Sequence, residues 1–221
     1  MSKWPASLIL ASGSPRRRRL LSCLGLPFRV VVPDVDEDVP SAADSTPEQM
    51  AEALAGAKAL AVAQRESRGL VLAADTLVVD SEAILGKPRD PDEAAAMLRR
   101  LRDREHRVIT GLALVDAGSP RLTLVDHVTT AVRMRPYSEE EIAAYIASGE
   151  PFDKAGAYAI QDPQFRPVAS YDGCYCNVVG LPLRAVVRLL REGRLDITIA
   201  HLAGLPPECE GCPLEVPFLS P

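Results

Sequence analysis

Residues 7–21 read Ser-Leu-Ile-Leu-Ala-Ser-Gly-Ser-Pro-Arg-Arg-Arg-Arg-Leu-Leu. An apolar run, Leu8 to Leu10, ends in small hydroxyl residues and is followed by a proline and four consecutive arginines. This order predicts a buried strand over about 7–11, a tight turn, and a helix over about 15–24 that begins at the proline. A strand that passes directly into a helix is typical of an α/β fold.

The first turn of that helix carries a strong positive charge. Free backbone N–H groups and the helix dipole already favour an anion at such a turn, and Arg16 and Arg17 add donors that fit phosphate oxygens in bidentate fashion. Helix N-termini usually prefer acidic residues, and local violations of this kind are expected at functional sites. A basic, solvated helix face is the alternative interpretation.

Composition limits the class of protein. The chain has 221 residues, is 47% hydrophobic and 25% charged, and carries a formal net charge of −5. A binder of duplex nucleic acid would more often be basic, so the arginine cluster indicates a small anionic ligand, and we expect no nucleic-acid partner. The sequence has neither an 18-residue apolar run nor a signal-peptide pattern, so we expect a cytoplasmic protein with no membrane partner.

The rest of the chain alternates between strand and helix patterns. We expect one bilobed α/β domain with a cleft over residues 1–192, followed by a Pro- and Cys-containing tail over 193–221, largely irregular and of unknown role. The sequence predicts helices at about 47–65, 90–101, 138–149 and 183–190, and loops with short strands over 150–182. It predicts strands at about 28–32, 69–74, 83–85, 106–115 and 121–133, with a strand-like continuation over 77–80.

Asp75 and Thr76 follow an apolar run, and we expect them at the end of a strand, where ligand clefts form in α/β proteins. Asp75 could bind a divalent metal ion or activate water as a base; an Asp that caps a turn fits equally well. Asp36 and Glu37, in an acidic loop, offer further oxygen ligands for Mg²⁺, although such loops are more often merely solvated.

Two further clusters suggest phosphate and base recognition. The segment Leu85-Gly-Lys-Pro88 departs from a Walker P-loop because Pro88 replaces the required Ser or Thr, yet Lys87 could contact phosphate or simply lie on the surface. In the segment from 150 to 161, Lys154 precedes small residues that allow close backbone approach, and the Gln161 amide offers both a donor and an acceptor to a base edge. Cations for phosphate, carboxylates for a metal ion or water, and an amide for base recognition together suggest hydrolysis of a phosphate ester or anhydride.

Five cysteines are present, and four of them form two short-spaced pairs, Cys174 with Cys176 and Cys209 with Cys212. A four-cysteine zinc site is conceivable, but a C-x-C pair matches the usual ligand spacing poorly. The sequence alone favours free thiols in a loop and a tail.

Six ordered motifs resemble those of the Maf family, the septum-formation-inhibitor-like nucleoside triphosphate pyrophosphatases, over about residues 7–190. They are Ser12-Gly-Ser-Pro-Arg-Arg17, Ala74-Asp-Thr76, Leu85-Gly-Lys-Pro88, His106-Arg-Val-Ile-Thr-Gly111, Glu150-Pro-Phe-Asp-Lys-Ala-Gly-Ala-Tyr-Ala-Ile-Gln161 and Asn177-Val-Val-Gly-Leu-Pro182.

The resemblance implies an α/β fold with a long, mixed, twisted sheet flanked by helices, and two lobes around a central cleft. It also implies hydrolysis of a nucleoside triphosphate to the monophosphate and pyrophosphate with a divalent metal cation, Mg²⁺ or Mn²⁺, and a possible homodimer. Arg16, Thr76 and Gln161 match the branch that acts on dTTP and UTP.

By the same resemblance, Asp75 is the catalytic base that activates water for attack on the α-phosphorus. The residues implied along the phosphate path are Ser12, Arg16, Arg17, Lys58, Lys87 and Lys154. Asp36 or Glu37 would join Asp75 in holding the metal. The sequence departs from the family at Asp162-Pro163, where a Gly is usual after Gln161, and we interpret His106 as structural.

Two other functions compete with this interpretation. One is a non-catalytic nucleotide-binding regulator of cell division, which the family name suggests. The other is nucleic-acid binding through Arg16 to Arg19, which the net charge of −5 disfavours.

Overall fold

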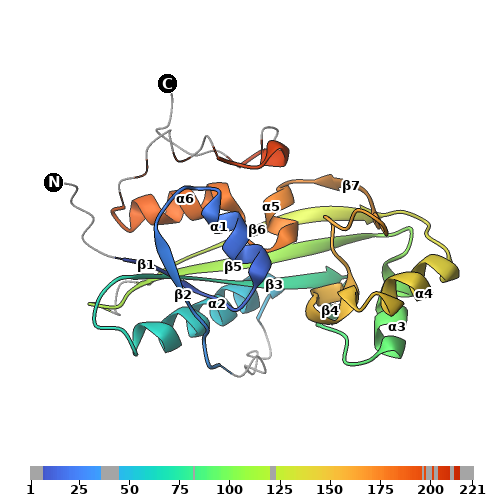
Figure 1. Cartoon of the computed structure of the whole chain (residues 1–221), viewed down its shortest axis with the longest axis horizontal. Helices are drawn as coiled ribbons and strands as arrows, with labels where there is room; N and C mark the ends of the chain where they lie inside the picture. The colour runs from blue at the N-terminus through green and yellow to red at the C-terminus, as the bar shows by residue number, and fades with distance from the viewer. Residues whose placement is uncertain are drawn as a thin grey trace.

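The computed structural model describes residues 7–35, 45–81, 83–119, 123–195, 197, 201, 204–209 and 212–214. Within these residues the chain forms a seven-stranded mixed sheet with helices packed on both faces (Figure 1). The long mixed sheet predicted from the sequence is confirmed. In this described part of the chain, no helix combines the length and the apolar character needed to cross a membrane.

The strands run in the spatial order β2-β1-β3-β5-β6-β7, with β4 paired to β3. Strand β1 is parallel to β2 and β3, and the remaining pairs are antiparallel. The strand bounds are β1 Leu8–Ala11, β2 Phe28–Val31, β3 Leu70–Asp80, β4 Ala83–Leu85, β5 Glu105–Asp116, β6 Thr123–Met134 and β7 Val168–Asp172.

Most of the helices begin where the sequence places a capping residue. Ser14, Thr46, Asp90 and Ser138 each accept a hydrogen bond from a backbone N–H in the first turn of the helix that follows. The helix bounds are α1 Pro15–Ser22, α2 Pro47–Ala63, α3 Pro91–Leu101, α4 Glu139–Ala147, α5 Tyr175–Val179 and α6 Leu183–Glu192, with 3₁₀ turns η1 Glu150–Asp153, η2 Ala155–Ala157 and η4 Pro207–Cys209.

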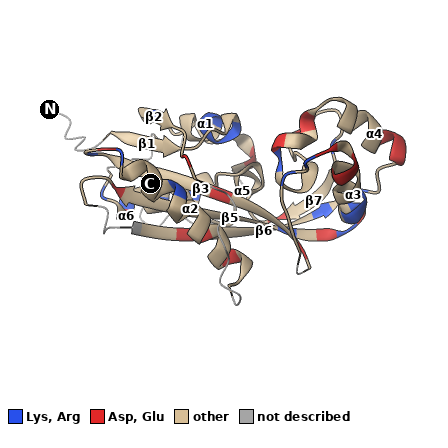
Figure 2. Cartoon of the chain, turned by 90° about the horizontal axis from the view of Figure 1, so that it is seen from below, with Lys and Arg blue, Asp and Glu red and all other residues tan. Residues whose placement is uncertain are grey.

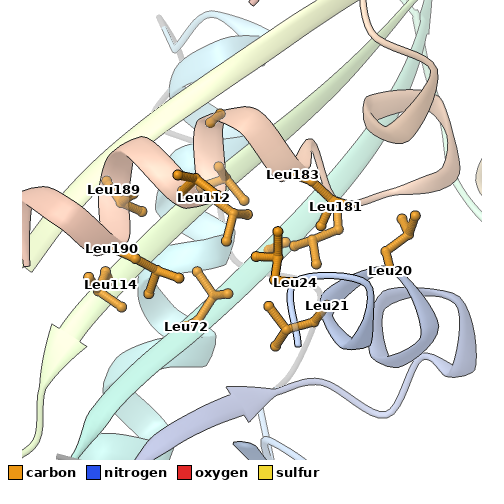
Figure 3. Close-up of a cluster of buried hydrophobic side chains, with 14 of the residues drawn as sticks. Leu20, Leu21, Leu24, Leu72, Leu112, Leu114, Leu181, Leu183, Leu189 and Leu190 are labelled. Carbon is orange, nitrogen blue, oxygen red and sulfur yellow. The ribbon is translucent and has the colours of Figure 1, made fainter. Parts of the chain in front are cut away.

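In one half of the sheet, alternate strand residues pack into two hydrophobic clusters, one on each face. Leu72, Leu112 and Leu114 pack against leucines of α1 and α6 (Figure 3). Their neighbours Val71 and Ala113 pack on the opposite face, against the small buried side chains of α2. Successive residues of a strand point to opposite faces, so β3 and β5 read as nearly continuous apolar runs because both of their faces are covered.

A second core lies at the other end of the same strands. Val78, Val108 and Val132 of β3, β5 and β6 pack there with α3, α4 and the aromatic rings of Tyr137 and Phe165. One continuous set of strands therefore supports both lobes. Between the two cores the strands carry polar and small residues, and the β3–β5 register pairs Asp75 with Gly111 and Thr76 with Thr110.

Three features differ from the sequence-based expectation. Asp75 lies in the middle of β3 rather than at a strand end, because the pairing with β5 continues without a break past it to Val79. The segment 150–182 contains the short helix α5, which has no side-chain cap and depends on burial of Cys176 and Asn177. The described part of the tail is not loose, because Leu195, Ile197 and Cys209 belong to the first core.

Gly111 marks the point where α2 crosses the sheet most closely. A Cβ atom at this position would lie 2.2 Å from the carbonyl carbon and oxygen of Ala51 in α2. No flexible side chain can yield there, because the obstacle is backbone. By contrast, a Cβ at Gly56 in α2 would meet nothing within 4 Å.

We therefore expect Gly111→Ala to lower the free energy of unfolding by about 3 kcal/mol or more, since overpacking a backbone contact forces α2 away from the sheet. Gly56→Ala, the control, should raise it by up to about 1 kcal/mol, because alanine loses less entropy in a helix. Urea unfolding followed by circular dichroism measures both. Equal stability of Gly111→Ala and the wild type would contradict this account of α2 packing.

Candidate active site

A cavity of about 1040 Å³ opens over the polar middle of β3. Strand β1 pairs with β3 only at Leu70–Leu72 and β4 pairs with it only from Val78 onward. Within the described residues, residues 73–77 of β3 have no strand partner on that side, and the opposite side is paired with β5. The sheet therefore has a gap between β1 and β4, beside β3, and both Asp75 and Thr76 of β3 line the cavity there.

The cavity brings together the described residues that the sequence proposed as a site. They are Ser12, Arg16, Arg17, Lys58, Asp75, Thr76, Lys87, Lys154 and Gln161. Asp36 and Glu37 lie outside the described residues, although the preceding Val32, Pro33 and Val35 line the cavity. The size is at the upper end of the range for small-molecule sites, so a ligand larger than a simple phosphate fits.

Lys58 and Asp75 form a buried ion pair. Lys58 Nζ donates to Asp75 Oδ1 at 2.6 Å, and the residues are only 7% and 9% exposed. Asp75 lies on the α2 side of β3, where the buried face of α2 presents Lys58. Because a buried charge without a partner is strongly unfavourable, the lysine permits a carboxylate to exist at the base of the cavity.

Arg17 is fixed as part of the cavity wall by contacts to two separate elements. Its Nε donates to the carbonyl of Gly180 at 2.9 Å and one terminal nitrogen donates to Thr76 Oγ1 at 3.0 Å. Thr76 Oγ1 lies 2.9 Å from Thr110 Oγ1, which in turn donates to the carbonyl of Asn177 at 3.1 Å. This chain of hydrogen bonds holds the guanidinium group in one orientation toward the cavity.

Arg16 connects the two lobes across the cavity. One terminal nitrogen lies 2.6 Å from Asp153 Oδ2 of η1, and the other donates to the Asp153 carbonyl at 3.1 Å. Lys154, only 7% exposed, lies 2.6 Å from Asp153 Oδ1 and 2.9 Å from Glu150 Oε2. Figure 2 shows the basic residues of α1 on the side next to the lobe of α3 and α4.

Asp153 remains ionised between these two cations. Burial raises the pKa of its carboxyl group, but hydrogen bonds from Lys154 and Arg16 outweigh burial, and the pKa lies below its ordinary value. The charges of Arg16 and Lys154 are thus partly neutralised by a carboxylate of the cavity wall.

The turn before α1 supplies further polar groups. Ser14 Oγ caps the helix by accepting from the Arg17 N–H, and the Ser14 N–H donates to Ser12 Oγ at 3.2 Å. This arrangement agrees with an anion site at the start of α1.

Sequence reasoning assigned no role to Thr110 or Asn177, although both lie inside the quoted motifs. Asn177 is fully buried, and its Nδ2 donates to the carbonyl of Val108 and to Thr130 Oγ1, both at 2.9 Å. An asparagine between Cys176 and the apolar pair Val178-Val179 was the available signal, since a buried amide requires partners.

Two carboxylates of the described residues line the cavity, the buried Asp75 and the more exposed Asp153, and either could hold a metal ion. Across the described ranges, no group of three or more His, Cys, Asp or Glu side chains is already positioned around a metal. A hard cation such as Mg²⁺ fits this donor set nevertheless, because it is usually held by one or two carboxylates together with phosphate oxygens and water.

Comparisons with known proteins show the family to which the chain is similar. The Maf family, described as Maf-like protein, matches residues 7–193. The chain is 54% identical over 208 residues to a dTTP/UTP pyrophosphatase of Thermomicrobium roseum, covering 94% of each chain. It is 50% identical over 200 residues to one of Salinibacter ruber, covering 89% of this chain and 95% of that one.

Among solved structures, a HAM1 protein from Coxiella burnetii aligns with a TM-score of 0.43 and 17% identity, covering 73% of this chain and 89% of that chain. A nucleoside-triphosphatase / dITP/XTP pyrophosphatase from Mycobacterium abscessus aligns with a TM-score of 0.37 and 17% identity, covering 58% of this chain and 72% of that chain.

His106 lies behind the cavity wall rather than in it. Its Nε2 is 2.7 Å from the hydroxyl of Tyr158, a residue that lines the cavity. Burial lowers the pKa of His106 to about 4, so the ring is neutral at physiological pH. The geometry agrees with a structural role in which the histidine positions Tyr158.

This burial predicts a loss of stability in acid. The unfolded chain binds the His106 proton near pH 6.5 and the folded chain only near pH 4. The contribution of neutral His106 to the free energy of unfolding is therefore fully present above pH 6.5. It decreases by about 1.4 kcal/mol per pH unit as the pH falls toward 4. In urea unfolding measured from pH 7 to 4.5, the free energy of unfolding of His106→Gln should fall less steeply with pH than that of the wild type. The difference in slope should correspond to about one proton fewer taken up on unfolding.

His127→Gln is the control, because His127 is an exposed histidine of β6 whose Nδ1 contacts Glu52 Oε1 at 2.7 Å. Its removal should not flatten the slope. An imidazole NMR signal of His106 that titrates near pH 6.5 in the folded protein would refute the assignment.

Proposed function

Because the chain belongs to the Maf family, we propose that it hydrolyses nucleoside triphosphates, foremost dTTP and UTP, to the nucleoside monophosphate and pyrophosphate. The observation that carries this proposal is the cavity at the β3 gap, which places a buried carboxylate beside arginine and lysine side chains. The relatives named dTTP/UTP pyrophosphatase support the choice of substrate.

In this proposal the triphosphate lies along the cationic wall. Arg17 is held by Thr76 and Gly180, and its position requires little reorganisation when phosphate binds. Arg16 and Lys154 both contact the carboxylate of Asp153. A phosphate that binds here replaces Asp153 as their partner or contacts the two cations together with it. Lys87, from the turn after β4, lines the same cavity.

Asp75 acts as the general base on the attacking water. The water oxygen forms a bond to the α-phosphorus, the anhydride bond between the α- and β-phosphates breaks, and pyrophosphate leaves with the bonding electrons. The proton of the water passes to the Asp75 carboxylate. Lys58, at 2.6 Å, keeps this carboxylate in place at the base of the cavity.

A divalent cation, Mg²⁺ or Mn²⁺, would be held by Asp75 with Asp36 or Glu37 and would neutralise charge on the phosphates. Hard oxygen ligands suit either ion. This part of the proposal rests on the family resemblance and on the chemistry of the donors.

Gln161 reads the base. Thymine and uracil each present ring carbonyls and one N–H, which match an amide that both donates and accepts. Thr76 acts differently, because its hydroxyl contacts Arg17 and Thr110; we assign it to positioning Arg17 rather than to base recognition.

Purified protein with Mg²⁺ or Mn²⁺ should release pyrophosphate and monophosphate from a panel of nucleoside triphosphates, fastest from dTTP and UTP. Asp75→Asn should lower turnover by about 10²–10⁴-fold, the usual contribution of a general base, while dTTP still binds in calorimetry. Binding without turnover by the wild type would favour the nucleotide-binding regulator instead.

The folding of Asp75→Asn needs a control, since it leaves Lys58 buried without its counter-charge. The double variant Lys58→Met/Asp75→Asn removes both charges and should recover much of the lost stability while it stays inactive. Activity in the double variant would rule out Asp75 as the base.

Gln161→Ala should raise the KM for dTTP and UTP by about 3–10-fold, the value of one or two hydrogen bonds, with a smaller change in kcat. Gln164→Ala is the matched control, because Gln164 is exposed and is not among the residues that line the cavity. Equal KM values for the two variants would show that Gln161 does not contact the base.

A further inference from the structure

Four of the five cysteines meet at one place in the fold. Cys174 and Cys176 lie at the start of α5, Cys209 ends η4 in the tail, and Cys212 follows three residues later. The first three are 1%, 0% and 2% exposed, and Cys212 packs against the same core. The fifth, Cys23, instead donates its thiol to the carbonyl of Arg19 in its own helix.

The sulfur contacts link the two pairs. Cys176 Sγ is 3.0 Å from Cys209 Sγ, well beyond the length of about 2.05 Å of a disulfide. The Cys174 thiol also makes side-chain hydrogen bonds with the thiols of Cys176 and Cys212. Each of the four thiols therefore contacts at least one of the others, across two segments that are more than 30 residues apart.

Local backbone geometry explains how a C-x-C pair can contribute. Cys174 is the extended residue that precedes α5, with φ −103° and ψ 115°, and Cys176 lies in the first turn. The change from extended to helical backbone between them places both side chains in the core. Cys209 and Cys212 have the common C-x-x-C spacing of structural zinc sites, and a turn closes between them because the Cys212 N–H donates to the Cys209 carbonyl at 3.3 Å.

The surroundings suit a buried anionic cluster. Arg184 donates to the carbonyl of Cys209 at 2.9 Å and to that of Leu214 at 3.4 Å, which fastens α6 to both ends of the C-x-x-C segment. Its Nε is buried and has no hydrogen-bond partner among the described residues. A guanidinium group at this position offsets negative charge on thiolates.

We propose that Cys174, Cys176, Cys209 and Cys212 bind one structural Zn²⁺ ion that fastens the tail to α5. Zn²⁺ would replace the four thiol protons, with no change of oxidation state. The sulfurs as they stand do not yet form a ligand shell, so binding requires side-chain rotations that move Cys176 and Cys209 apart. A site with four protein ligands has no open position, and it is therefore structural rather than catalytic.

The site lies next to the active cavity without being part of it. Helix α5 ends at Gly180, whose carbonyl holds Arg17. Thr130 Oγ1 also bonds the backbone of Cys174 and accepts from Asn177. Zinc bound at the start of α5 would thus hold the cavity wall at its end.

The test measures metal content in the full chain, expressed with zinc and purified without chelator. Wild type and Cys23→Ser should each retain about one zinc per chain by plasma mass spectrometry, while Cys176→Ser and Cys209→Ser retain little. Replacement by Co²⁺ should give the strong thiolate-to-metal absorption of a tetrahedral sulfur site. This spectrum uses the wild type, so it remains decisive if the serine variants fail to fold.

Two results would overturn the proposal. Zinc-free wild type that shows no Co²⁺ absorption and has all five thiols titratable in denaturant would leave the cysteines free. A mass lower by two hydrogens, with Cys176 and Cys209 recovered in one linked peptide, would make the contact a disulfide. Asp75→Asn should keep its zinc, so this result is independent of whether the nucleotide chemistry is correct.

Discussion

The antiparallel pairing of β3 with β5 is the constraint on which the site depends. It continues through ten residue pairs, from Leu70 to Val79, and passes from one hydrophobic core into the other. The other side of β3 is covered by β1 at one end and by β4 at the other. Backbone hydrogen bonding to β5 keeps the strand extended across the gap, so the gap can remain open to a ligand without loss of the strand.

The charges around this gap are paired across elements that come from distant parts of the chain. Lys58 of α2 pairs with Asp75 of β3, and Arg16 of α1 pairs with Asp153 of η1. Such pairing keeps the cations in place and lowers the cost of bringing them together. It also favours a polyanion over a single phosphate, because a ligand must compete with carboxylates that are already present.

Sequence patterns were sufficient for most of the scaffold. Alternating apolar residues and the caps Thr46 and Ser138 located the long strands and helices, because these signals are local. The described residues that the sequence proposed for the site all line the cavity. Asp75 was misplaced at a strand end, since strand pairing beyond it depends on β5, far along the chain.

The remaining features depend on tertiary contacts that no local pattern reveals. Helix α5 is a single turn stabilised by burial, and the contact between Cys176 and Cys209 joins residues brought together only by the packing of the tail. The same is true of the ion pair between Arg16 and Asp153. Spacing alone therefore did not reveal that the two cysteine pairs meet in the fold.

Continuous strands beneath both lobes also limit how the protein can move. Within the described ranges the two lobes share β3, β5 and β6, so they can approach each other only if these strands twist or bend together. A hydrogen-bonded ladder resists such bending more than a hinge loop does. The cleft is consequently preorganised, and the protein loses little conformational entropy by closure when a nucleotide binds. Selectivity must then come from the fixed shape and charge of the walls rather than from induced fit.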